Sequence, residues 1–181
     1  MKSAFIPLLL ALSSPVMAGE RLPIGKVTDA PIGAETLCID YFWACMDSQS
    51  PSFRVDLRKI ENINRKVNAG VKEISDIEQY GADEKWTLPI GNRGDCEDFA
   101  MLKKYMLIRE GIPAENLLIS TVLDTQNQGH AVLIFRTGDT DFVLDNLTNK
   151  IVPWYDTGYL FIRMQNPDLP STWVSVISKG E

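Results

Sequence analysis

Apolar residues recur at helical spacing in the first half of the chain. Within 53–69 they stand three or four positions apart with charged residues between them, which predicts an amphipathic helix that stops at Gly70. This stripe consists of Leu57, Ile60, Ile63 and Val67. Segment 34–46 is apolar and aromatic and predicts a buried helix, and 75–80 predicts one more short helical turn. Segments 19–33 and 83–94 contain several glycines and prolines, so we expect an irregular entry segment and a loop there.

A further helix is predicted directly after Cys96. Its apolar positions repeat with helical period, and Gly111 and Pro113 end it. The stripe expected to face the core consists of Phe99, Ala100, Leu102, Met106 and Leu107, and the residues expected to face water are Lys103, Lys104 and Arg109. Cys96 precedes the first two stripe residues by three and four positions, so we expect it at the helix N-terminus on the buried-facing side.

After Pro113 the pattern changes to short apolar and β-branched runs. They occupy 117–123, 131–135, 142–144, 158–164 and 173–177, and turn residues separate them. Helices followed by strands predict an α+β fold, in which the N-terminal helices pack on an antiparallel sheet.

The first eighteen residues have the pattern of a secretory signal peptide. Lys2 supplies a short positive region, the apolar run 4–12 is well short of the ~20 residues that a spanning helix needs, and small residues precede an expected cut after Ala18. A membrane anchor is the disfavoured alternative. We therefore expect residues 19–181 to form one exported domain, most simply in a bacterial periplasm, without stable insertion in a membrane.

Charge and cysteine content narrow the class of protein further. The formal net charge is −6 and no basic cluster is present, which argues against a nucleic-acid partner. An exported compartment permits disulfides, and the economical pairing of the three cysteines joins Cys38 to Cys45 and leaves Cys96 free. In an unbroken helix, residues at this separation lie roughly 10 Å apart, beyond the ~7 Å limit for a bridge. The pair therefore needs a break in the predicted helix, and two buried free thiols remain the alternative.

The candidate chemistry centres on Cys96, His130 and Asp145. A thiol at a helix N-terminus meets the positive end of the helix dipole and free backbone N–H groups, which favour the thiolate and can form part of an oxyanion hole. His130, the single histidine, opens one predicted strand, and Asp145 follows the next. A hairpin would bring these two side chains within hydrogen-bond reach. The three residues predict a Cys-His-Asp hydrolase, with His130 as the base and Asp145 orienting it.

Each member of this set also has an ordinary structural explanation. A lone cysteine is often a small buried hydrophobe, a histidine at a strand start is often a partly exposed polar residue, and an aspartate before Asn-Leu-Thr can start a turn. Trp86 is equally open, because it could line the acyl site, donate its indole N–H to the oxyanion, or simply be a core aromatic. The functional interpretation depends on the three residues meeting in space.

Three carboxylates surround the proposed nucleophile: Asp95, Glu97 and Asp98. Asp95 can serve as the N-cap of the helix, and acids suit its first turn. Negative charges beside a thiolate nevertheless raise its pKa and oppose nucleophilicity. Bound Ca²⁺ would remove this conflict, because carboxylate oxygens are its preferred ligands. Capping with solvated acids and no metal is the alternative, and zinc does not suit a chain with one histidine and one free cysteine.

At these residues the chain resembles the bacterial transglutaminase-like cysteine proteinase family. The resemblance covers nearly all of 19–181, and its specific motifs are Gly-Asp-Cys-Glu-Asp at 94–98, Gly-His-Ala-Val at 129–132 and Leu-Asp-Asn at 144–146. It implies a papain-like or transglutaminase-like α+β fold in which Cys96, His130 and Asp145 form the triad. LapG-type proteases of this family need Ca²⁺, bound by acids that match Asp95, Glu97 and Asp98. They cleave surface proteins and are restrained by an inner-membrane receptor.

The sequence thus predicts a periplasmic thiol endopeptidase that depends on Ca²⁺ and acts on a protein or peptide substrate. The resemblance adds an inner-membrane regulatory receptor as a candidate partner. A transglutaminase or deamidase acting on glutamine side chains would use the same triad, and a non-enzymatic periplasmic binding module is a third alternative. The scissile sequence and the oligomeric state are left open by the sequence.

Overall fold

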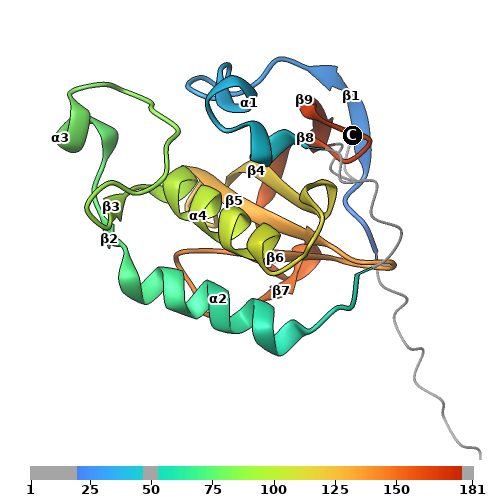
Figure 1. The fold of residues 1–181 in the computed structure, drawn as a ribbon. Coiled ribbons are helices and arrows are strands. Elements are labelled where there is room, and N and C mark those ends of the chain that lie inside the picture. Colours follow the sequence, from blue (N-terminus) through green and yellow to red (C-terminus); the bar gives the residue numbers. More distant parts are fainter. Residues whose placement is uncertain (1–19, 47–52, 177–181) are drawn as a thin grey trace, which may run out of the picture.

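The computed structural model describes residues 20–46 and 53–176. The predicted signal peptide and the last position of the predicted strand 173–177 lie outside the described residues. A seven-stranded antiparallel sheet forms the scaffold, in the order β1-β9-β8-β4-β5-β6-β7 (Figure 1). Its strands are β1 (Ile24–Thr28), β4 (Leu117–Leu123), β5 (Gly129–Arg136), β6 (Asp141–Leu144), β7 (Val152–Pro153), β8 (Leu160–Asn166) and β9 (Leu169–Val176). The predicted α+β class is confirmed.

The helices precede most of the sheet in sequence, as expected. They are α1 (Leu37–Asp40), α2 (Leu57–Gly70), α3 (Asp76–Tyr80) and α4 (Cys96–Arg109), with 3-10 turns η1 (Phe42–Cys45), η2 (Ala114–Asn116) and η3 (Trp154–Asp156). Asp56 caps α2 by accepting from the backbone N–H groups of Arg58 and Lys59, and Ser75 caps α3. The short parallel pair β2 (Lys72–Glu73) and β3 (Arg93–Gly94) closes the base of the excursion that carries α3.

Two expectations for the N-terminal part need correction. The entry segment is not wholly irregular, since it contains edge strand β1, whose Ile24 and Val27 side chains are 44 % and 71 % exposed and give no buried alternation to recognise. The predicted helix 34–46 is broken at Tyr41 into α1 and η1. The break brings the Cα atoms of Cys38 and Cys45 to 5.5 Å, and a disulfide joins them.

Helix α4 is enclosed by other elements rather than lying on the surface. It packs on β4 and β5, while α2 and η1 cover further faces (Figure 1). The prediction that Lys103 and Lys104 face water is therefore wrong, because they are 1 % and 0 % exposed. Lys104 Nζ donates to Gln165 Oε1 at 2.6 Å, and the same oxygen accepts from the backbone N–H of Ile119. The prediction took one side of this helix to face solvent, but α2 and η1 cover that side.

A second apolar core lies on the opposite face of the sheet. Its buried members are Leu22, Leu118, Val122, Val132, Ile134, Val143, Phe161, Met164, Val174 and Val176. The segment before β1 reaches the far end of the sheet, where the Leu22 N–H donates to Asp141 on β6 at 2.9 Å and Glu20 accepts from the Trp154 indole at 2.9 Å. The segment before β1 therefore links the two edges of the sheet across the face that carries this second core.

The burial of Lys104 predicts a specific pH dependence of stability. Burial lowers the pKa of Lys104 from 10.5 to about 7, so the unfolded chain binds more protons than the folded chain between these values. This linkage makes the free energy of unfolding rise with pH across that window. Lys104→Met should show a smaller rise than the parent between about pH 7 and about pH 10 in urea titrations.

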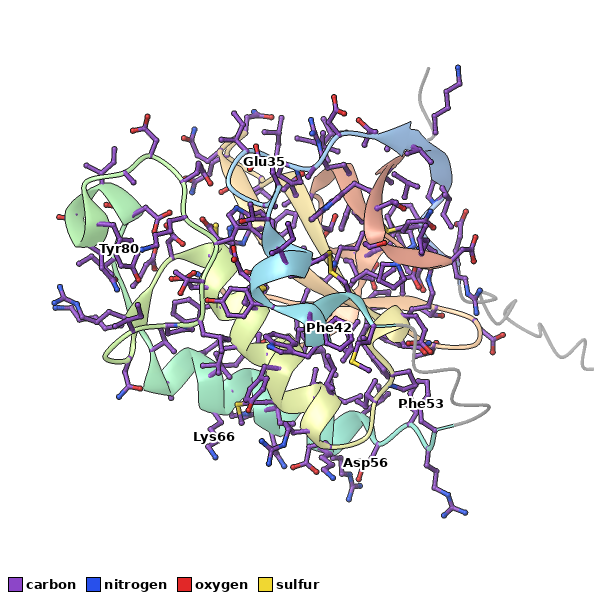
Figure 2. The ribbon with its side chains drawn as sticks, turned by 45° about the horizontal axis from the view of Figure 1, so that its top comes forward. Glu35, Phe42, Phe53, Asp56, Lys66 and Tyr80 are labelled. Carbon is purple, nitrogen blue, oxygen red and sulfur yellow. A yellow bond between two sulfur atoms is a disulfide. The ribbon has the colours of Figure 1, made fainter. Side chains whose placement is uncertain are left out.

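The control is Lys66→Met, on the exposed outer side of α2 (Figure 2). It should preserve the pH dependence of the parent chain. An identical pH dependence in Lys104→Met and the parent would show that the buried lysine is not the titrating group.

Candidate active site

The nucleophile position is set by the start of α4. Asp95 occupies the N-cap position with extended backbone, and Cys96 is the first helical residue. The Cys96 side chain is half-buried and lines a cavity of about 370 Å³ together with His130 and Ala131 of β5. Its thiol donates to Glu97 Oε2 at 3.2 Å. The packing of α4 on β5 thus brings the predicted nucleophile and the single histidine to one cavity.

His130 and Asp145 are in direct contact. His130 is the second residue of β5 and pairs with Val122 of β4, and Asp145 follows the last residue of β6. His130 Nε2 lies 2.9 Å from Asp145 Oδ1, and the two side chains are 7 % and 3 % exposed. With Nε2 committed to the carboxylate, Nδ1 is the ring nitrogen left to exchange a proton with another group.

Asp145 is held by two further donors. The Tyr159 hydroxyl donates to Oδ2 at 2.6 Å, and the Leu147 backbone N–H donates to Oδ1 at 3.0 Å. Burial by itself raises the pKa of Asp145, but the hydrogen bonds from His130, Tyr159 and Leu147 outweigh it and lower the pKa. Asp145 is therefore ionised at neutral pH and able to orient an imidazole.

Segments distant in sequence form the walls of the cavity. The loop after β1 contributes Ile32, the loop before β3 contributes Glu84 and Trp86, and β8 contributes Ile162 and Arg163. Trp86 is 7 % exposed and meets Trp173 edge to face at a centroid distance of 5.8 Å. Its indole N–H lies near the Glu84 carboxyl without a well-aligned hydrogen bond. Trp86 is thus both a packed aromatic and a lining residue of the cavity.

The carboxylates around Cys96 divide into two groups. Asp95 makes no side-chain capping bond, so the expected N-cap interaction is absent. Its carboxylate meets those of Glu97 and Asp76, with one oxygen of each lying within 4.8 Å of the others. Asp98 points elsewhere, because its Oδ1 accepts from the Thr87 backbone N–H at 2.9 Å. The predicted set Asp95, Glu97 and Asp98 is therefore only partly brought together.

The cluster Asp76–Asp95–Glu97 carries an electrostatic penalty. Burial, and then the charge of Asp95, raise the pKa of Glu97 to about 9. Burial raises the pKa of Asp76 and Asp95 as well. Asp95 Oδ1 is buried and accepts no hydrogen bond from the described residues. An all-oxygen donor set with an unpartnered buried carboxylate oxygen fits a hard divalent cation such as Ca²⁺.

The same acids act on the thiol. Burial is the largest cause that raises the pKa of Cys96, followed by the charge of Glu97 and the hydrogen bond to it. A hydrogen bond from the Ala131 backbone acts in the opposite direction but does not offset these effects. With the carboxylates uncompensated, Cys96 is therefore held as a thiol.

Two residues of this arrangement were not singled out by sequence reasoning. Asp76 begins α3, twenty positions before the proposed nucleophile, and an acid in a first helical turn has an ordinary explanation. Tyr159 lies in the loop before β8, and nothing local marks it as a partner of Asp145. Their only sequence signal was membership of longer stretches that resemble the family.

Comparison with known proteins assigns the family. Residues 24–181 match the family described as bacterial transglutaminase-like cysteine proteinase BTLCP. The chain belongs to this family. No curated protein matches the chain.

Solved structures of LapG from Legionella pneumophila are similar in fold. One is 28 % identical with a TM-score of 0.53, and the match covers 61 % of this chain and 65 % of the LapG chain. An EGTA-treated LapG structure has the same identity and TM-score. The calcium-bound LapG structure is 25 % identical with a TM-score of 0.56, covering 69 % of this chain and 71 % of that one. The present chain thus spans about two thirds of the LapG chains that it matches.

The Gly-Asp-Cys-Glu-Asp motif has a packing reason for its glycine. A Cβ atom on Gly94 would meet the Asp98 carboxylate and lie 2.6 Å from its Cβ atom. We expect Gly94→Ala to displace Asp98 from Thr87 and to lower the free energy of unfolding by roughly 1–3 kcal/mol, because overpacking a close contact costs that much. Urea unfolding measures the change.

Gly70→Ala is the control, since a Cβ atom there meets nothing within 4 Å and helix α2 ends at this residue. It should leave stability unchanged or raise it slightly. Equal stability of Gly94→Ala and the parent would contradict the packing role.

Proposed function

We propose that the protein is an exported thiol endopeptidase that works through an acyl-enzyme. The observation that carries this proposal is the hydrogen bond between His130 Nε2 and Asp145 Oδ1, 2.9 Å long, beside a cavity that also contains Cys96. Membership of the cysteine proteinase family supports the choice of reaction. We further propose that the occupant of the cavity is a protein or peptide chain.

Each group has a defined role in the proposed reaction, and His130 acts in turn as base and as acid. His130 Nδ1 takes the proton of Cys96, and the sulfur attacks the scissile carbonyl. Backbone N–H groups at the start of α4, with the Trp86 indole as a further candidate, receive the oxyanion. His130 then protonates the leaving amine, and water hydrolyses the thioester with His130 as base. Asp145 keeps the imidazole oriented and stabilises its charged form.

We propose that Ca²⁺ binds Asp76, Asp95 and Glu97 rather than the flanking set that includes Asp98. The ion would neutralise the carboxylates that raise the pKa of Cys96. The mutual proximity of these three carboxylates, and the existence of calcium-bound and EGTA-treated forms of LapG, support the assignment.

Export to a periplasm is the location that we propose. The signal-peptide pattern at 1–18 and the disulfide between Cys38 and Cys45 support it, because such bonds persist in oxidising compartments. Among the described residues, no helix is long and apolar enough to cross a membrane.

The test incubates the folded enzyme with a second protein as substrate, which has been reduced, alkylated and unfolded, in the presence of a primary amine. An endopeptidase produces new N-termini, which mass spectrometry locates, whereas a transglutaminase attaches the amine to glutamine and a deamidase converts glutamine to glutamate. We expect new N-termini. Amine incorporation or glutamate formation without cleavage would reject the endopeptidase proposal and favour the alternative chemistry.

We expect Cys96→Ala, His130→Ala and Asp145→Ala each to reduce turnover by about 10³-fold or more, since triad members act as a unit. The generic ester p-nitrophenyl acetate serves as the probe: the thiolate attacks it, p-nitrophenolate leaves, and water releases acetate. Asp139→Asn, at an exposed position in the β5–β6 turn, is the control and should retain activity. Near-full activity of His130→Ala would reject the triad, because the chain has no second histidine.

We expect Ca²⁺ to raise the melting temperature of the EGTA-treated protein, with a stabilisation of about 2.7 kcal/mol at a hundredfold excess over Kd. Asp76→Asn and Asp95→Asn should lose this gain, whereas Asp98→Asn should keep it even if its baseline stability falls. Asp83→Asn, in the exposed loop after α3, is the control. Loss of the gain in Asp98→Asn but not in Asp76→Asn would reverse the ligand assignment.

A further inference from the structure

We propose that Tyr159 is a positioning residue of the reaction, whose hydroxyl fixes the rotation of the Asp145 carboxylate so that Oδ1 faces His130. This inference rests on the proposed function, in which Asp145 orients the catalytic imidazole. Tyr159 does not itself line the cavity that contains Cys96, and its hydroxyl reaches the site through Asp145.

The two oxygens of Asp145 have separate partners. Oδ1 is 2.9 Å from His130 Nε2 and 3.0 Å from the Leu147 backbone nitrogen, whereas Oδ2 accepts, among the described residues, from the Tyr159 hydroxyl alone, at 2.6 Å. Asp145 is 2 % exposed, so its carboxylate depends on donors of the protein rather than on bulk solvent. Without that donor, Oδ2 would be a buried charged acceptor with no partner, and rotation of the carboxylate would be the route to relieve it.

The segment that carries Tyr159 is itself anchored. Gly158 has a φ of +72°, a left-handed conformation that turns the chain into β8. The Tyr159 backbone N–H donates to Thr157 Oγ1 at 3.1 Å, and that hydroxyl donates to the Trp154 carbonyl at 2.7 Å. Trp154 is bonded in turn to Glu20 at 2.9 Å. The Tyr159 hydroxyl is thus delivered from a fixed turn rather than from a free loop.

Tyr159 also contacts the imidazole through its ring. The rings of His130 and Tyr159 lie edge to face, with centroids 6.0 Å apart and planes at 90°. The side chain therefore makes two separable contacts: the hydroxyl with Asp145 and the ring with His130. Tyr159→Phe removes the first and keeps the second.

The electrostatics agree with a permanent donor. Burial raises the pKa of Tyr159, and so do the hydrogen bond to Asp145 and the charges of Asp145 and Asp124. Tyr159 therefore stays protonated at any pH at which a hydrolase works, and Asp145 stays ionised beside it. A protonated phenol facing an ionised carboxylate is a charge-assisted bond, which is stronger and more directional than a neutral one.

A purely structural role is the competing explanation, because Tyr159 packs against the second core. An NMR signal of His130 distinguishes the structural role from the positioning role. When Nε2 donates to Asp145, its proton gives a downfield NMR resonance, and ¹⁵N correlation to an imidazole nitrogen assigns it to His130, the single histidine. A packing residue would affect stability without moving this signal.

The experiment compares the parent with Tyr159→Phe and Tyr155→Phe. Tyr155 is the matched control, because it lies four positions earlier, is 39 % exposed, packs on Trp154, and its hydroxyl makes no hydrogen bond with a described residue. In Tyr159→Phe we expect the Nε2 proton resonance to shift or broaden, and kcat for p-nitrophenyl acetate to fall about tenfold with KM within about twofold of the parent value. Tyr155→Phe should match the parent in all three readouts.

Unchanged resonance and kcat in a folded Tyr159→Phe would overturn the proposal, and a loss of melting temperature alone would assign Tyr159 to packing. If Tyr159→Phe does not fold, Tyr159→Gln supplies a shorter donor without adding a second histidine, and its failure to restore the parent resonance position while stability recovers would also overturn the proposal. The NMR readout needs no turnover. An inactive parent with a resonance that responds to Tyr159→Phe would therefore reject the proposed function while retaining the positioning role.

Discussion

The enclosure of α4 is the constraint on which the candidate site depends. The helix packs on β4 and β5 and is covered by α2 and η1, so its axis cannot shift without opening the main core. Because Cys96 is the first residue of this helix, the same packing places the proposed nucleophile near the start of β5, where His130 lies. This enclosure buries two lysines, which costs free energy of desolvation. One of them, Lys104, donates a hydrogen bond to Gln165 at 2.6 Å. Large apolar burial on every side of the helix offsets that cost.

The site combines two opposing electrostatic environments. The hydrogen bonds to Asp145 lower its pKa by more than burial raises it. Asp145 is therefore a stable anion that can orient His130. On the other side of the thiol, Asp76, Asp95 and Glu97 have raised pKa values, and the charge of Lys85 does not offset the effect of burial on Asp76. In the proposed reaction the imidazole side supplies the base, while burial and the carboxylate side raise the pKa of Cys96 and hold it as a thiol. A cation on the carboxylate side is the simplest way to bring the two halves into one working site.

The family match and the similarity to LapG both agree with this chemistry, but they cover different shares of the chain. The family match runs from β1 to the C-terminus, whereas the similarity to LapG covers about two thirds of either chain. The excursion closed by β2 and β3 brings Asp76, Glu84 and Trp86 to the α4 N-terminus. Gly94 allows the final approach of Asp98 to this excursion. The local architecture of the site is therefore built by one loop and one helix start, supported by the sheet.

Local patterns were enough to place most elements and the three residues proposed as a triad. Helical spacing located α2 and α4, and the strand runs located five strands of the sheet. The hairpin spacing of His130 and Asp145 predicted their contact, and the helix start placed Cys96. Edge strand β1 was not visible, because it has no buried alternation of its own, and the break in helix 34–46 was expected only as the condition for a disulfide between Cys38 and Cys45. Tertiary structure alone decided which acids gather, turning Asp95 away from its capping role toward Asp76 and sending Asp98 to Thr87. It also decided the burial of Lys103 and Lys104 and the bond from Tyr159 to Asp145. Periodicity reports which residues share a face, but only the packing of distant segments determines what each face meets.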